Sequence, residues 1–274
     1  MAADDTFYGD GTSYTLDVPV HGNCNLMWTP AVAAENYAAL NDPQWANLAN
    51  CGRCAQVRCV DPQCTSKASV LVMFVDRCPE CKHGDVDLGP SAFHAITGLN
   101  STRLKIAWSF APCPVQGPMN ICLKTGSSPH WLAVQPSNVP LGVRSVRVQG
   151  YPTTMLDSCF YFKPDTTALI PLENLRVDIT FIDDSMKGVL IPSIGAATCT
   201  NGYREVASEA HVQDPAGSSA AAGPLVPLLV TAVVLGVAAA LFIAWRVRQQ
   251  RAKAARISRA FRLVVPVEDD VATL

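Results

Sequence analysis

Two aspartates, Asp76 and Asp87, flank a loop rich in cysteine, proline and glycine. The apolar run from Ser69 to Val75 predicts a buried strand that ends on Asp76. After Asp87, a helical pattern from Ser91 to Ile96 begins behind Pro90, a residue suited to the first helical turn. Acids at the lip of a groove can perform general-acid chemistry on a glycosidic oxygen, because one carboxyl stays protonated beside another that stays charged. The alternative is structural: one acid closes the loop and the other flanks the helix.

The residues around these acids resemble the signature of the expansins. They read VDRCPECKHGDVDLGPSAFHAI, and the expansin pattern is a D-x-C-P turn followed by D-L-S-x-x-A-F at the rim of a six-stranded double-psi β-barrel. This chain carries Gly89 where serine is usual. Further similar motifs follow one order through residues 4 to 200: Thr6-Phe7-Tyr8-Gly9, Gly22-Asn23-Cys24, Cys51-Gly52-Arg53-Cys54 with Cys59, and Gly126-Ser127-Ser128-Pro129-His130-Trp131.

The resemblance implies an all-β ectodomain. Residues 1–115 would form the double-psi β-barrel and residues 119–205 an expansin-like, carbohydrate-binding β-sandwich. It also implies that Asp87 is the essential acid of a groove, that Asp76 hydrogen-bonds in the same site, and that Thr6 and Tyr8 line it. Expansins loosen polysaccharide contacts without hydrolysing them. The expected function is therefore non-hydrolytic loosening of a cellulose-like wall glucan, with no cofactor and no metal.

A third acid keeps hydrolysis open as an alternative. Family-45 endoglucanases, which share the groove, carry a general base in a T-x-Y-x-D first strand, and this chain has Asp10 at the matching position. Asp87 would then be the acid and Asp10 the base, with their carboxyls roughly 6.5–9.5 Å apart. We expect the first strand to cover Thr6 to Tyr8 and a glycine-rich turn to follow from Gly9 to Ser13, which makes Asp10 a loop acid. A carbohydrate-recognition receptor without catalysis is a further hypothesis.

Short strands separated by turn residues predict the β-sandwich of the second domain. The expected strands are 120–124, 131–135, 143–149, 159–162, 175–182 and 189–191. The corresponding expansin domain binds through a row of exposed aromatics. The resemblance assigns Trp131 to that row, with His130 at the preceding aromatic position and Phe160 or Tyr161 close to the third, near Ser158. A core position for Trp131 is the alternative.

Eleven cysteines, all between Cys24 and Cys199, predict an extracellular, disulfide-bonded region. The resemblance implies the bridges Cys24–Cys51, Cys54–Cys113 and Cys59–Cys64. Cys78 and Cys81 can pair together or separately, and among Cys122, Cys159 and Cys199 one thiol is left free or intermolecular. The competing interpretation is a zinc ribbon, built from Cys51, Cys54, Cys78 and Cys81 with His83 nearby.

The C-terminal part predicts a single-pass membrane protein. Leu225 to Trp245 is uncharged for 21 residues, which at ~1.5 Å rise per residue spans ~31 Å, about the hydrocarbon thickness of a bilayer. A cluster of arginines and lysines begins directly afterwards at Arg246, which places the tail, 246–274, in the cytoplasm and the cysteine-rich domains outside. Residues 206–224 are polar and small and predict a flexible linker. The net charge of -2 gives no bulk attraction to nucleic acid.

Three further expectations concern the N-terminal half. No targeting pattern precedes Thr6, so we expect an upstream leader or insertion directed by the transmembrane segment. The Ala-rich segment from Asn25 to Asn50 predicts short helices, and we expect its Tyr37 to pack inside the barrel. Asn100-Ser101-Thr102 is an N-glycosylation sequon, which is usable if the domain is lumenal.

Overall fold

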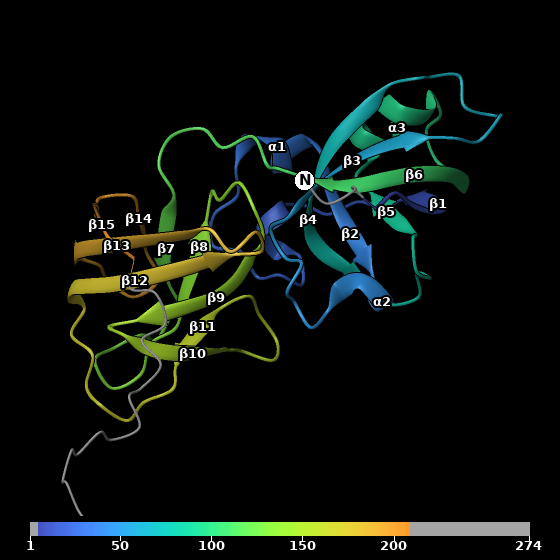
Figure 1. Ribbon diagram of the computed structural model, residues 1–274. Helices are drawn as coiled ribbons and strands as arrows, with labels where there is room; N and C mark the ends of the chain where they lie inside the picture. The colour runs from blue at the N-terminus through green and yellow to red at the C-terminus, as the bar shows by residue number, and fades with distance from the viewer. Residues whose placement is uncertain (1–4, 209–274) are drawn as a thin grey trace, which may run out of the picture. The chain divides into compact units, whose positions relative to one another are not determined.

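The structure is a computed structural model that describes residues 5–208, and the first part of this range is a closed six-stranded barrel (Figure 1). The strands follow the order β1-β5-β2-β4-β3-β6. β1 pairs with β5, and β2 with β4, in parallel, whereas the other neighbours are antiparallel. The predicted six-stranded barrel is thereby confirmed. Its strands are β1 (Phe7–Ser13), β2 (Tyr37–Asn41), β3 (Cys54–Cys59), β4 (Ser69–Cys78), β5 (Val86–Leu88) and β6 (Leu104–Ala111).

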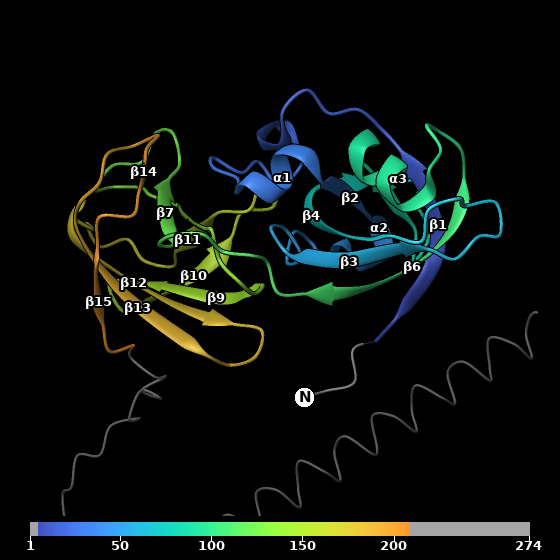
Figure 2. The ribbon, with the colours of Figure 1, turned by 90° about the horizontal axis from the view of Figure 1, so that it is seen from above.

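The helices of the described residues are short. They are η1 (Pro19–His21), α1 (Ala31–Glu35), α2 (Asp42–Trp45) and α3 (Pro90–Thr97). α3 begins at Pro90, as predicted, and ends at Gly98, whose φ of 75° is left-handed and whose N–H bonds to the carbonyl of His94. Phe93 and Ile96 form the buried side of α3, which packs beside β1, β3 and β4 (Figure 2).

β1 continues through the residues for which we expected a turn. The expected turn from Gly9 to Ser13 is wrong, and Asp10 lies inside a strand. Gly9 and Gly11 do not reverse the chain; they let β1 approach neighbouring residues closely. A Cβ at Gly9 would lie 2.2 Å from the carbonyl carbon of Gly84, and one at Gly11 would lie 2.7 Å from Cγ2 of Ile106.

The structure also corrects the segment in which we expected only short helices. α1 and α2 are present, but β2 lies between them in the chain and all five of its residues are buried. Because β2 is enclosed by β5 and β4, it lacks the polar–apolar alternation that marks a half-exposed strand. Tyr37, at its start, is buried as predicted, with 7% exposed, but it lies on the strand face of Ala39 and packs on Tyr14 instead of pointing inside the barrel.

The second part is a nine-stranded antiparallel sheet in the order β14-β7-β8-β11-β10-β9-β12-β13-β15. β10 joins two halves of it, pairing through Tyr151 and Pro152 with β9 and through Thr153 to Met155 with β11. Apolar side chains from both halves belong to one core, which makes the arrangement sandwich-like. β10, β14 and β15 were not predicted. The strands are β7 (Asn120–Leu123), β8 (Val134–Ser137), β9 (Val143–Val148), β10 (Tyr151–Met155), β11 (Phe162–Pro164), β12 (Glu173–Phe181), β13 (Met186–Ser193), β14 (Cys199–Thr200) and β15 (Arg204–Val206).

The disulfides confirm the pairing that the resemblance implied. Cys24–Cys51, Cys54–Cys113 and Cys59–Cys64 are present, and the structure adds Cys78–Cys81 and Cys122–Cys199. Among the described residues Cys159 is the free thiol, and it is buried. All four cysteines of the zinc-ribbon interpretation are bonded to other cysteines, so that interpretation is wrong.

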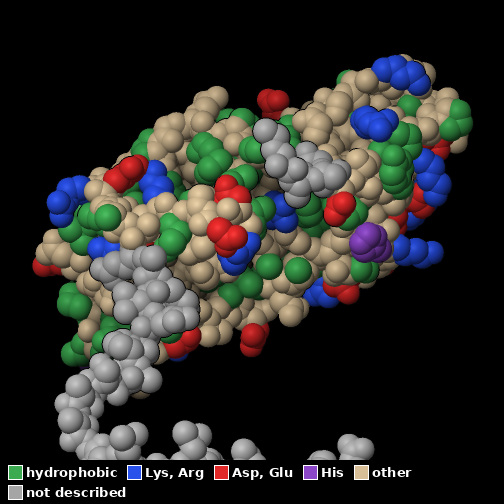
Figure 3. Space-filling model, viewed as in Figure 1, with side chains coloured by type: hydrophobic (Ala, Val, Ile, Leu, Met, Phe, Trp, Pro, Cys, Tyr) green, Lys and Arg blue, Asp and Glu red, His purple; other side chains and the backbone are tan. Residues whose placement is uncertain are grey.

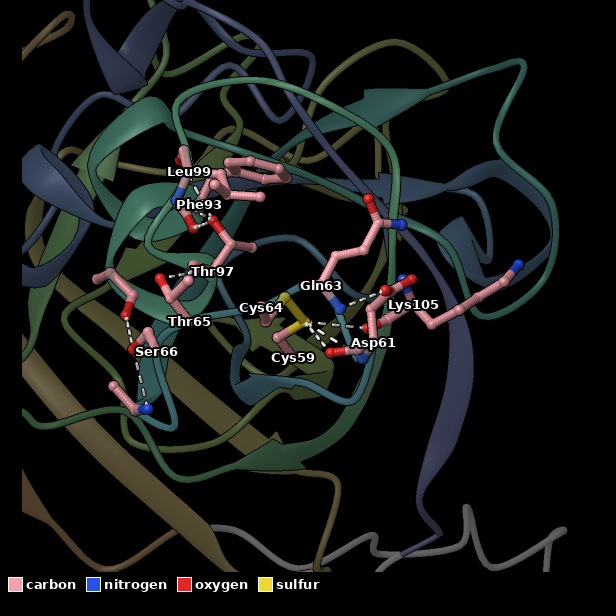
Figure 4. The surroundings of a disulfide bond; sticks show 12 residues. Cys59, Asp61, Gln63, Cys64, Thr65, Ser66, Phe93, Thr97, Leu99 and Lys105 are labelled. Carbon is pink, nitrogen blue, oxygen red and sulfur yellow. Dashed lines mark hydrogen bonds between the residues drawn. A yellow bond between two sulfur atoms is a disulfide. The ribbon is translucent and has the colours of Figure 1, made fainter.

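The Cys59–Cys64 bridge closes a tight loop that is fixed to β6 (Figure 4). Asp61 accepts the backbone N–H of Gln63 at 3.0 Å and, through its other carboxylate oxygen, the backbone N–H of Lys105 at 3.1 Å. The loop therefore supports the strand whose Lys105 side chain pairs with Asp10.

The predicted membrane span, Leu225 to Trp245, and the tail 246–274 lie outside the described residues, as does most of the predicted linker. Within residues 5–208 no helix has the length and apolar character needed to cross a membrane.

Candidate functional site

Four residues form a row across four neighbouring strands of the barrel, which we call the acid row: Thr12, Asp87, Ala39 and Asp76. Thr12 of β1 lies opposite Asp87 of β5, which lies opposite Ala39 of β2, which lies opposite Asp76 of β4. Residues directly opposite each other share a face of a sheet, so the two acids face the same way with only the Ala39 methyl between them. Strand spacings of ~4.8 Å place the Cα atoms of the acids roughly 10 Å apart.

Asp87 is half-buried and hydrogen-bonded within the row. Its strand neighbours Val86 and Leu88 are fully buried in the core, so its side chain points to the outer face of the barrel. Thr12 Oγ1 donates to Asp87 Oδ1 at 2.8 Å. Burial raises the pKa of Asp87, against the effect of the Thr12 bond. The carboxyl therefore keeps its proton to a higher pH than an ordinary aspartate, as a general acid or a hydrogen-bond donor requires.

Asp76 is held by the loop that carries the Gly22-Asn23-Cys24 motif. Its Oδ1 accepts the backbone N–H of Asn23 at 2.8 Å, the Asn23 side-chain amide at 2.7 Å and the N–H of Arg77 at 2.9 Å. A Cβ at Gly22 would lie 2.2 Å from the carbonyl oxygen of Val75, so only glycine lets the loop approach β4 this closely. The motif thus explains how Asp76 is fixed.

Asp10 lies on the same face of β1 as Thr12, two residues along the strand. Its Cα is roughly 8 Å from that of Asp87, from the spacings of a β-sheet. Its carboxylate pairs with Lys105 and, at 3.4 Å, with Arg103. The hydrogen bond from Lys105, followed by the charges of Lys105 and Arg103, lowers the pKa of Asp10 against its partial burial. Asp10 is therefore an ionised but charge-compensated group at one end of the row.

Charges elsewhere on the described surface are mixed. On the face seen in Figure 3, basic and acidic side chains are interspersed instead of gathering into a field of one sign. Such a surface does not attract a polyanion electrostatically.

The other predicted site residues lie apart from the acids or are buried. Thr6 precedes β1 and is exposed, and Tyr8 is 66% exposed on the same strand face as Asp10. Trp131 is 37% exposed beside a hollow that His130 and Lys163 also line.

Tyr161 is only 2% exposed and does not join an exposed aromatic row. It packs against Ala133 and Cys159, and the Lys124 ammonium lies 5.3 Å from the centre of its ring. The residue directly precedes β11 and lies in a small buried cluster separate from the one that holds Phe162.

Tyr14 belongs to the site and was missed from the sequence. Its hydroxyl is buried and has no hydrogen-bond partner among the described residues. Its ring packs edge to face on Tyr37, with ring centres 5.5 Å apart. Burial, then the negative charge of Asp76, raises the pKa of Tyr14, and Asp87 acts in the same direction. The alternation of Tyr8, Asp10, Thr12 and Tyr14 is the signal that shows these side chains share one face of a strand.

The barrel is similar to known proteins in both sequence and structure. A family model described as lytic transglycolase matches residues 37–108, which contain both acids of the row. The described chain also superposes on the crystal structure of the Clavibacter michiganensis expansin with a TM-score of 0.62 and 25% identity, covering 74% of this chain and 97% of that one. A variant of that expansin has been solved in complex with cellohexaose.

Curated relatives extend the similarity across both parts of the chain. Expansin-like protein 5 of Dictyostelium discoideum is 28% identical over 187 residues, covering 64% of this chain and 75% of the relative. Expansin-like protein 1 of the same organism is 26% identical over 226 residues, covering 78% and 77%. By these comparisons the chain is similar to expansin-like proteins.

Proposed function

We propose that this protein is a membrane-anchored expansin-like protein that binds cell-wall polysaccharide and loosens it without hydrolysis through a groove centred on Asp87 and Asp76. The acid row is the observation that carries the proposal. It sets a carboxyl that retains its proton beside a second, rigidly held acid, with the small Ala39 between them. The cellohexaose complex of the similar C. michiganensis expansin favours a cellulose-like glucan as the ligand.

The environment of Asp10 favours loosening over hydrolysis. An inverting hydrolase needs a base that is free to take a proton from water. Here the Asp10 carboxylate is already paired with Lys105 and Arg103, and the hydrogen bond from Lys105 weakens it as a base. Loosening needs no activated water. A groove that binds a strained glucan tightly competes with glucan–glucan contacts through binding energy alone.

Hydrolysis remains the second candidate because Asp10 shares a strand face with Thr12, with its Cα roughly 8 Å from that of Asp87. In that case Asp87 is the acid and Asp10 the base.

We assign Tyr8 and Thr6 to the groove wall, and Trp131 to sugar stacking in the second domain, because its ring is partly exposed.

The decisive experiment combines binding and product analysis on the purified protein. The assays are titration with cellohexaose, co-sedimentation with insoluble wall glucans, mechanical loosening and release of reducing ends. Asp87→Asn should abolish loosening, whereas Asp10→Asn and the exposed second-domain control Asp157→Asn should preserve it. Release of reducing ends by the parent that falls by about 10²–10⁴ on Asp10→Asn would instead identify an endoglucanase. Binding with neither loosening nor product would identify a recognition receptor.

The membrane anchor is proposed from the sequence of Leu225 to Trp245 and the basic residues that follow it. Protease added to intact cells should remove the barrel and leave a small membrane-bound fragment that contains the tail. Protection of the barrel together with reduced cysteines would contradict this orientation.

A further inference from the structure

We propose that the hydroxyl of Tyr14 donates a hydrogen bond to the Asp76 carboxylate and holds that acid in position beside Asp87. Tyr14 is thereby a positioning residue of the acid row. The inference deepens the proposed function, and its consequence for polysaccharide binding rests on that function, whereas the hydrogen bond itself does not.

The first support is the unmatched donor. The Tyr14 hydroxyl is buried without a partner among the described residues, and burying a hydroxyl in that state is unfavourable. Tyr14 continues β1 directly beside the row, since its backbone N–H bonds to the carbonyl of Leu88, the neighbour of Asp87 in β5, at 3.0 Å. Asp76 is the charged group that acts most strongly on the Tyr14 phenol.

The second support is the unmatched acceptor. The three hydrogen bonds that fix Asp76 within the described residues, two from Asn23 and one from Arg77, all end on Oδ1. A carboxylate accepts through both oxygens, so Oδ2 is left for a further donor. The Tyr14 hydroxyl, a buried donor without a partner among the described residues, is the donor we assign to Oδ2, since the Asp76 charge already acts on its phenol.

The third support is the packing of the Tyr14 ring on Tyr37, which holds the phenol beside the acid row. The ring of Tyr14 rests on Tyr37, and the Tyr37 hydroxyl accepts the backbone N–H of Leu16 at 3.0 Å. Tyr37 fits because residue 89 is glycine. A Cβ at Gly89 would lie 3.0 Å from Cζ of Tyr37. The one departure from the expansin pattern next to Asp87 therefore makes room for the aromatic pair that supports Tyr14.

A fixed Asp76 matters for Asp87. The charged and titratable groups that face Asp87 are Glu80, Arg103, Asp76 and Tyr14. Glu80 belongs to an exposed loop and Arg103 is an exposed side chain. Asp76 is the one of these charges that several hydrogen bonds hold in place. A hydrogen bond from Tyr14 would therefore fix the position of a charge that, after burial and Glu80, raises the pKa of Asp87.

A double-mutant cycle in urea unfolding tests the bond on the whole protein. Tyr14→Phe keeps the ring and its packing on Tyr37 and removes only the hydroxyl. We expect it to lower the urea midpoint in the parent. In an Asp76→Asn background the loss should shrink by about half or more, because bonds to a charged acceptor are roughly twice as strong as those to a neutral one. Tyr37→Phe is the matched control and should cost the same in both backgrounds.

Two outcomes would overturn the inference. A midpoint that rises or stays constant on Tyr14→Phe would mean that the hydroxyl has no partner, and equal losses in both backgrounds would mean that its partner is not Asp76. The cycle is read from unfolding alone, so it stands even if the protein binds no glucan. Titration with cellohexaose then tests the link to function, and Tyr14→Phe should weaken binding several-fold.

Discussion

Gly89→Ser restores the residue usual in expansins, and we expect it to destabilise this protein. Gly89 is the residue before α3, its N-cap, with φ of -58° and ψ of 149°, a conformation that any residue adopts. Backbone strain therefore plays no part. The obstacle is the Tyr37 ring, because a Cβ at position 89 would lie 3.0 Å from Cζ and 3.1 Å from both Cε atoms.

The expected size of the effect follows from three opposing contributions. Forcing an extra carbon into a packed site costs about 1–3 kcal/mol. Serine regains a few tenths of a kcal/mol as a helix cap, and losing glycine's freedom in the unfolded chain contributes about 0.4–1 kcal/mol of stabilisation. The free energy of unfolding should fall by about 1 kcal/mol, because the steric contribution is the largest.

Urea denaturation of parent and variants measures this change, and a second substitution isolates its cause. In a Tyr37→Leu background the ring is absent, so Gly89→Ser should become neutral or stabilising by about 0.5 kcal/mol. Tyr37→Phe should give no such rescue, because the clashing atoms belong to the ring. Stabilisation by Gly89→Ser in the parent would refute the packing explanation for this glycine.

Three further predictions test other parts of the molecule. Burial raises the pKa of Asp87, so between the unfolded and the folded pKa the folded protein keeps a proton that the unfolded chain has released. The free energy of unfolding should therefore fall as the pH rises through this interval. Asp87→Asn should flatten that slope in pH-dependent denaturation. Thr12→Val removes the bond that opposes this shift, so NMR titration of the Asp87 carboxyl should show its pKa move further upward. Gln135→Leu should lower the free energy of unfolding by about 3 kcal/mol in urea denaturation, because a fully buried amide that bonds Met27, Asn25 and Phe160 is lost and its backbone partners stay unpaired.

The sequence anticipated the parts of the fold that depend on short-range signals. The apolar run into Asp76 and the Pro90 helix start are both found, and the family resemblance supplied three disulfides correctly. β2 was missed because a strand buried on both faces carries no alternation, and its Ala-rich residues suit helices as well. Gly9 and Gly11 were assigned to a turn because glycine is common in turns. Their real cause, close contact with Gly84 and Ile106, involves residues more than seventy positions away, which no local pattern contains.

Pairing between strands that are distant in the sequence also explains why only part of the site was predicted. Asp76 and Asp87 were identified as a pair, but the residue that separates them, Ala39, comes from a strand that the sequence did not indicate. Its methyl leaves a gap between the two carboxyls, and the charges of both act on the phenol of Tyr14. Hydrolysis would need Asp10, two residues from Thr12 on β1, as the base, and Lys105 and Arg103 already compensate its charge. The polar contacts around Asp76 and Asp87 therefore agree better with the proposed non-hydrolytic loosening than with cleavage.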